Sequence, residues 1–113
     1  MKLFEFEKLE EGLDWARNIK GIWVMFNTHA KDRANQYGID LDMVNEVVKK
    51  VPDLRNKFKE LPDGHKFSVW SKSKNMGVSL RKYADKDGYQ RVEVMTTIKK
   101  LYDSDDNPAF FVG

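Results

Sequence analysis

The spacing of apolar residues changes near residue 65, and this change limits the folds that the chain can adopt. Before it, apolar residues mostly recur every three or four positions, which is the spacing along one face of an α-helix. After it, apolar and polar residues alternate, which is the pattern of a half-buried β-strand. The sequence therefore predicts a domain that combines helices, mainly in its first half, with a sheet in its second half.

The first half is predicted to hold three helices and one strand. Helical spacing covers residues 4–19, 28–38 and 40–51, with Gly38 and Pro52 as the stop signals of the last two. Between the first two helices, the continuous apolar run 22–26 suits a buried strand.

The second half is predicted to form an antiparallel meander. Alternation over 67–72, 76–83 and 89–99 gives three strands, and 109–112 is either a short fourth strand or a packed tail. The predicted fold class is α+β, with N-terminal helices packed on one face of a three- to four-stranded antiparallel sheet. A chain of 113 residues suits a single domain, 1–113.

Two features that the sequence lacks limit the chemistry and the location that we expect for this protein. The chain has no cysteine, which excludes disulfides, thiolate metal sites and a cysteine nucleophile. The longest apolar run is too short to cross a bilayer, and the first twenty residues mix bases and acids instead of forming a signal peptide. We therefore expect a cytoplasmic protein with no membrane partner.

Positive charge is concentrated in one segment. The whole chain carries a net charge of +2, but residues 49–82 hold ten basic residues against three acidic ones, a balance of +7. Such a block suits a phosphate-binding surface if it occupies one face of the fold. The competing interpretation is an ordinary solvated face.

The two histidines, His29 and His65, are the first candidates for proton transfer near neutral pH. Arg33 follows His29 by four residues, so both side chains can project from one face of a helix. The competing interpretation is a helix-start residue and an exposed loop residue. No histidine spacing typical of a metal site occurs, so neither a metal nor another cofactor is expected.

Cations and aromatic residues are mixed along the predicted meander. This mixture suits single-stranded RNA, because cations contact phosphates and aromatic rings stack on unpaired bases. The competing interpretations place the aromatics in the core and the lysines at a sheet edge, or make Trp70 and Phe110–Phe111 a protein-binding patch. The candidate RNA-binding residues are Lys66, Trp70, Lys72, Lys74, Arg81, Arg91 and Lys99.

Residues 28–40, THAKDRANQYGID, and the segment LDMVNEVV that follows resemble a group of small phage and bacterial proteins. These proteins are related to the RelE-like mRNA interferases and the RegB-type phage endoribonucleases, which have the barnase/colicin/RelE-like ribonuclease fold. The resemblance implies metal-independent RNA cleavage by attack of the RNA's own 2′-hydroxyl, with His29 as the matching active-site position. It covers residues 22–51 by motif and residues 66–100 only by pattern.

These observations together predict an endoribonuclease of phage or toxin type. One of His29 and His65 would act as general base and the other as general acid, while Arg33, with Arg81, Lys72 and Lys74, offsets phosphate charge. Candidate partners are mRNA, the ribosome and an antitoxin, and the compartment would be the host cytoplasm for a phage protein. The alternative is a non-catalytic regulator that binds RNA or a host protein.

Overall fold

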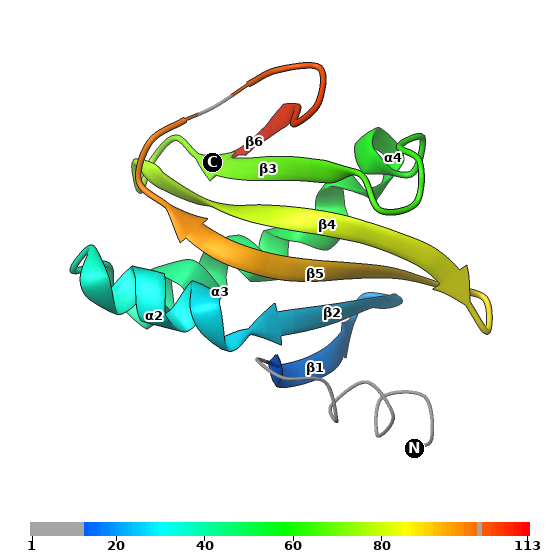
Figure 1. Ribbon diagram of the computed structural model, residues 1–113, viewed down its shortest axis with the longest axis horizontal. Coiled ribbons are helices and arrows are strands. Elements are labelled where there is room, and N and C mark those ends of the chain that lie inside the picture. The colour runs from blue at the N-terminus through cyan, green and yellow to red at the C-terminus, as the bar shows by residue number, and fades with distance from the viewer. Residues whose placement is uncertain (1–12, 102) are drawn as a thin grey trace.

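A six-stranded mixed sheet forms the centre of the computed structural model, which describes residues 13–101 and 103–113 (Figure 1). Its strand order is β1-β2-β5-β4-β3-β6. The pairs β2–β5 and β3–β6 are parallel, and the other three pairs are antiparallel. The strands are β1 (Leu13–Ile19), β2 (Ile22–Asn27), β3 (Lys66–Ser71), β4 (Met76–Lys86), β5 (Tyr89–Ile98) and β6 (Ala109–Val112).

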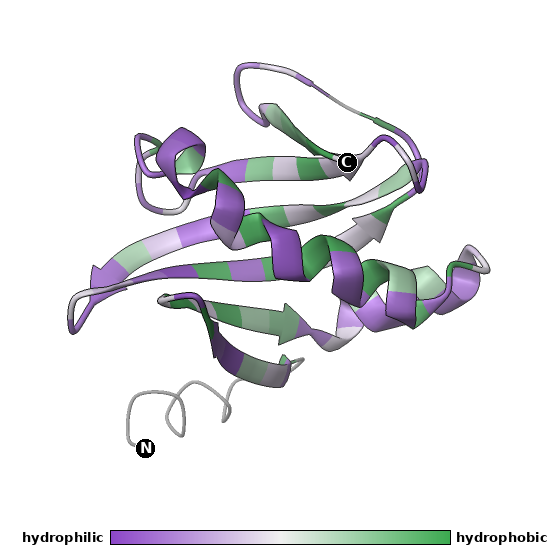
Figure 2. Cartoon of the chain, turned by 180° about the vertical axis from the view of Figure 1, so that it is seen from behind, coloured by the Kyte–Doolittle hydropathy of each residue, from purple (hydrophilic) through white to green (hydrophobic). Residues whose placement is uncertain are grey.

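The helices of the described residues lie between β2 and β3 in the sequence. They are α2 (Thr28–Gln36), α3 (Leu41–Lys50), the 3₁₀ turn η1 (Val51–Leu54) and the short α4 (Arg55–Phe58). In Figure 1 the sheet lies in front of α3, and in the reversed view of Figure 2 α3 crosses in front of the strands. Helix α3 therefore packs against one face of the sheet, and α2 contributes the buried Ala30 and Ala34 to the same core.

The core lies between this face and the helices. Valines of α3, among them Val44 and Val48, are fully or almost fully buried against inward-facing strand residues such as Val94. Phe58 of α4 stacks on Phe67 of β3 with 4.9 Å between ring centroids. The alternation of the strands thus sends one set of side chains into this core and the other set to the opposite face.

That opposite face, away from the helices, is called the outer face below. Its members alternate with buried core residues along β2, β5, β4 and β3. They include Trp23, Asn27, Lys66, Arg81, Tyr83, Arg91 and Glu93.

The predicted fold class was wrong. Helices do cover one face of a sheet, but the sheet has six strands and is mixed, not three to four antiparallel strands, and strand outweighs helix. The two parallel pairs bring together segments that are far apart in the sequence. Alternation in the sequence reveals that a segment is a strand, but it does not reveal the neighbour of that strand.

The predicted helix over 4–19 was also wrong where it can be compared, because residues 13–19 form β1; residues 4–12 lie outside the described part of the chain. Lys20 and Gly21 both have positive φ, 51° and 87°. Two such residues form the tight turn that joins antiparallel strands, so β1 and β2 are a hairpin.

The other predicted elements are confirmed. The strand at 22–26, the helices beginning near residues 28 and 40, and the three strands of the meander are all present. Of the two alternatives for 109–112, the strand is correct, since β6 pairs with β3.

Candidate functional site

Helix α2 carries a row of polar side chains on one face. His29, Arg33 and Tyr37 follow each other at intervals of four residues, so they lie one above the next along the helix. Arg33 Nε donates to His29 Nε2 at 3.2 Å, and another guanidinium nitrogen of Arg33 donates to the Tyr37 hydroxyl at 3.3 Å. The His29–Arg33 proximity predicted from sequence is therefore present.

Lys99 extends this row beyond the helix. Its ammonium lies 4.7 Å from the centroid of the Tyr37 ring, just past the end of β5. A cavity of about 170 Å³ is lined there by Tyr37, Ile98, Lys99 and Lys100. The α2 row, defined as His29, Arg33, Tyr37 and Lys99, thus joins three residues predicted from sequence through a tyrosine that was not predicted.

The two cations of the α2 row contact other side chains of the row. Arg33 bonds an imidazole and a phenol, and Lys99 lies on an aromatic ring. Neither cation forms an ion pair with an acid of the described residues. Both charges therefore remain available to an anionic ligand, next to an exposed histidine.

The outer face holds a second group of cations. Lys66 pairs with Arg81 in the β3–β4 register, and Arg81 pairs with Glu93 in the β4–β5 register, so these side chains form a row across three strands. Arg91 pairs with Tyr83 in the same β4–β5 register, and its guanidinium lies 5.9 Å from the centroid of the Tyr83 ring. Arg81 Nε is buried and has no hydrogen-bond partner among the described residues.

Glu93 is the acid of this group, and sequence analysis did not select it. Its carboxylate accepts a hydrogen bond from the Tyr83 hydroxyl at 2.6 Å and one from Asn27 Nδ2 at 2.9 Å. No motif in the sequence could have identified it, because the three residues come from three strands that become neighbours only in the folded sheet.

His65 lies far from His29. His65 comes just before the start of β3, where its backbone oxygen accepts a hydrogen bond from Lys82 N. His29 comes just after the end of β2, which runs in the same direction as β3, so the two histidines lie at opposite ends of the sheet. The strands β5 and β4 separate the two, which amounts to three interstrand steps or about 14 Å, before any displacement along the strands. The structure does not bring the two histidines to one phosphate.

The remaining predicted residues, Trp70, Lys72 and Lys74, lie in three different environments. Trp70 is only 8% exposed and lies against Gly77, so little of its ring is accessible for base stacking. Lys72 lies 4.9 Å from the Phe111 ring centroid. Lys74 forms a 2.8 Å ion pair with Glu46 of α3, on the helix side of the sheet.

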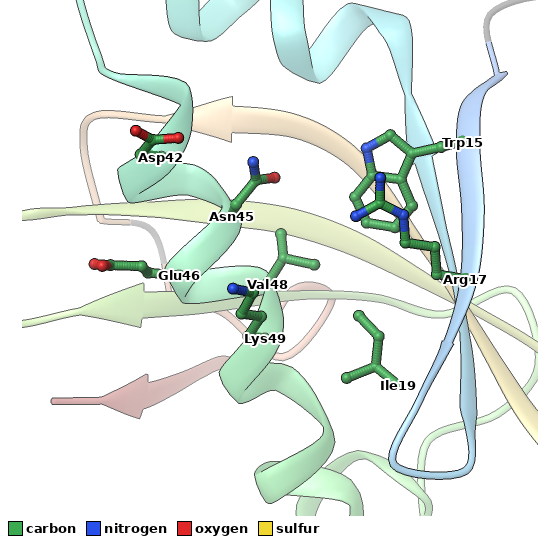
Figure 3. A pocket seen from close by; sticks show the side chains of 8 residues that line it. All are labelled: Trp15, Arg17, Ile19, Asp42, Asn45, Glu46, Val48 and Lys49. Atoms are coloured by element: carbon green, nitrogen blue, oxygen red, sulfur yellow. The ribbon is translucent and has the colours of Figure 1, made fainter.

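A cleft of about 340 Å³ lies between β1 and α3, with side chains of the two elements on its opposite sides (Figure 3). Arg17 lies over the Trp15 ring at 4.5 Å, and Trp15 stacks on Phe26. The lining carries acids and bases together, and it contains none of the residues predicted as functional.

Known families, curated proteins and solved structures give no match to this chain. The resemblance of residues 28–48 to the RelE-like and RegB-type ribonucleases therefore stays a prediction. Function has to be inferred from the chemistry of the α2 row and the outer face.

Two absences apply to residues 13–101 and 103–113. None of the helices there is long and apolar enough to cross a membrane. No group of three or more His, Asp or Glu side chains within this part of the chain is placed to hold a metal ion.

Proposed function

We propose that this chain is a metal-independent endoribonuclease with its cleavage site on the α2 row. The observation that carries the proposal is the 3.2 Å contact between His29 Nε2 and Arg33 Nε on an exposed helix face. A group that can exchange a proton near neutral pH is thereby held next to a permanent positive charge. These are the two groups that phosphodiester cleavage by an internal hydroxyl requires.

His29 would serve as the general base. In the absence of RNA its Nε2 lone pair accepts a hydrogen bond from Arg33. Phosphate oxygens that attract the guanidinium free this lone pair, and Nε2 then takes the proton of the 2′-hydroxyl. The Nε2 lone pair of His29 would therefore become available as a base when a substrate phosphate binds Arg33.

The reaction itself balances without a cofactor. The 2′-oxygen bonds to phosphorus, the bond from phosphorus to the 5′-oxygen breaks, and the products are a 2′,3′-cyclic phosphate and a 5′-hydroxyl. Arg33 stabilises the charge that develops on the phosphate oxygens. Because the site is exposed and His65 is remote, the 5′-oxygen takes its proton from water.

The outer face would bind the rest of the RNA strand. Lys66, Arg81 and Arg91 supply cations, and Trp23 and Tyr89, which contact each other edge-on at 6.5 Å, supply aromatic surface. Such a mixture suits unpaired RNA, such as the single-stranded parts of an mRNA in the host cytoplasm.

A second candidate function is RNA binding without cleavage. It is favoured by the separation of His65 from His29, which leaves one histidine at the site, and by outer-face cations that do not depend on His29. A regulator of this type would use the same outer face, and an antitoxin or host protein would remain a candidate partner.

The test is cleavage of a single-stranded RNA oligonucleotide in EDTA by the purified full chain. We expect 2′,3′-cyclic phosphate ends, and we expect the same oligonucleotide with 2′-deoxy sugars to resist. His29→Ala should lower the rate about 100- to 10,000-fold, the usual contribution of a general base.

His65→Ala is the matched control, because it removes the same side chain at the other end of the sheet, and it should cleave at the parent rate. Full activity of His29→Ala would remove His29 from the mechanism. Tight binding by the parent chain without any cleavage would select the second candidate.

A further inference from the structure

Asn27 connects the outer face to the first turn of α2. It is the last residue of β2 and also the N-cap of the helix, with extended φ and ψ of −79° and 139°. Its Oδ1 accepts the backbone N–H of His29 at 2.8 Å, while its Nδ2 donates to Glu93 Oε2 at 2.9 Å. One amide therefore bonds the residue proposed as the base on one side and a strand carboxylate on the other.

Glu93 is fixed in turn by the sheet. It lies in the middle of β5, between the fully buried Val92 and Val94, and its second oxygen accepts from the Tyr83 hydroxyl at 2.6 Å. A carboxylate held by two donors from two other strands has little freedom to rotate. The anchor of Asn27 is thus a rigid part of the sheet.

The position of Glu93 is unfavourable for RNA binding alone. A carboxylate beside Arg81 on a face that binds phosphates weakens the positive potential of that face. Glu93 would therefore have a role other than binding RNA, and its hydrogen bond to Asn27 indicates a structural role.

We propose that Glu93 is a positioning residue for His29, acting through Asn27. This inference rests on the proposed endoribonuclease function. The carboxylate holds the Asn27 amide in the one orientation that caps α2, and the cap holds the first helical turn and with it the His29 ring. A displacement of about 1 Å of a reacting group can cost about 100-fold in rate, so this anchoring would affect catalysis.

Asn27→Asp separates the two contacts of this amide. Aspartate caps helices as well as asparagine does, but the new carboxylate at position 27 faces Glu93 and cannot donate to it. We expect kcat to fall about 10- to 100-fold, in addition to the rise in KM that a second carboxylate on the outer face would cause. Asn27→Ser keeps a capping oxygen, lacks the side-chain amide nitrogen and adds no charge, so its kcat should also fall, with KM unchanged.

The double variant Asn27→Asp/Glu93→Gln reverses the donor and the acceptor. A glutamine amide at position 93 can donate to the new carboxylate and still accept from Tyr83. Activity should therefore return to within about threefold of the parent, as expected when coupled sites compensate each other. Asn56→Asp, the same change of charge on the exposed surface of α4, is the control and should behave as the parent.

Amide hydrogen exchange of His29 gives a readout that needs no activity. In Asn27→Asp the capping side chain is no longer anchored to Glu93, so the cap should open more often and exchange should speed up about fivefold to tenfold; the double variant should restore protection. If the parent chain cleaves no RNA, the endoribonuclease proposal fails, while these exchange rates still decide whether Glu93 positions His29. Parent-like rates and exchange in Asn27→Asp, or a double variant that restores neither, would overturn the positioning role.

Discussion

The salt dependence of RNA binding gives a quantitative test of the outer face. Four cations lie on that face or at its margin: Lys66, Lys72, Arg81 and Arg91. Each phosphate contact to a single strand contributes about −0.7 to the slope of log affinity against log salt, so four contacts predict a slope of about −2.8. Between about 50 and 200 mM salt, this slope corresponds to about a 50-fold loss of affinity.

Lys66→Ala/Lys72→Ala removes two of these contacts from β3 and the turn that follows it. The slope should fall to about −1.4, and the loss over the same salt range to about sevenfold. Lys74→Ala is the matched control from the same stretch of chain, because Lys74 faces α3 and is paired with Glu46. It should leave the slope unchanged.

The measurement is fluorescence anisotropy of a labelled RNA oligonucleotide, made with every variant in a His29→Ala background so that the RNA stays intact. A parent slope near zero would refute the outer face as an RNA-binding surface. So would a Lys74→Ala slope that falls as far as that of the double variant.

Two further predictions concern stability and pH. Gly77→Ala should lower the free energy of unfolding by about 2–3 kcal/mol in urea denaturation, because a Cβ there would overlap the backbone oxygen of Val69 in the paired strand β3. An unchanged midpoint would contradict this packing. The hydrogen bond from Lys74, together with its charge, lowers the pKa of Glu46 below its usual value of 4.5. The ion pair therefore stabilises the fold above the unfolded-state pKa of Glu46 and is lost as the pH falls through the lower folded-state pKa. Lys74→Ala should raise this pKa in an NMR titration, and an unchanged value would show that the pair does not form in solution.

The sequence was sufficient for elements whose signals are local. Gly38 after the second predicted helix and Pro52 after the third are such signals, and α2 and α3 end close to where they predict. The segment 13–19 is different, because its sequence fits both the spacing of a helix and the alternation of a strand. Leu13, Ala16 and Ile19 suit a helix, whereas alternate residues from Leu13 to Ile19 suit a strand, and the turn at residues 20–21 decides for the strand.

The candidate site also combines contacts between residues close in the sequence, which could be predicted, with contacts that depend on the order of the strands. His29 and Arg33 could be placed together because a spacing of four residues within a helix is a local relation, and Tyr37 follows from the same rule. The predicted cooperation of His29 with His65 needed the order of strands in the sheet. That order is determined by packing of the whole chain, and it separates the two residues by two intervening strands.

The basic block shows why segment charge alone does not define a surface. Arg81 and Lys82 are neighbours in β4, so their side chains leave the sheet on opposite faces. Arg81 lies beside Glu93 on the outer face, whereas the Lys82 ammonium is buried and donates to the backbone oxygens of Lys59 and Leu61 at 3.0 and 2.8 Å. The Lys82 charge is occupied by backbone carbonyls in the core, so only those cations of residues 49–82 that strand alternation turns outward remain candidates for RNA binding. The prediction of an RNA surface thus depends on which side of its strand each residue occupies, and β4 places one of two consecutive basic residues on the outer face and the other in the core.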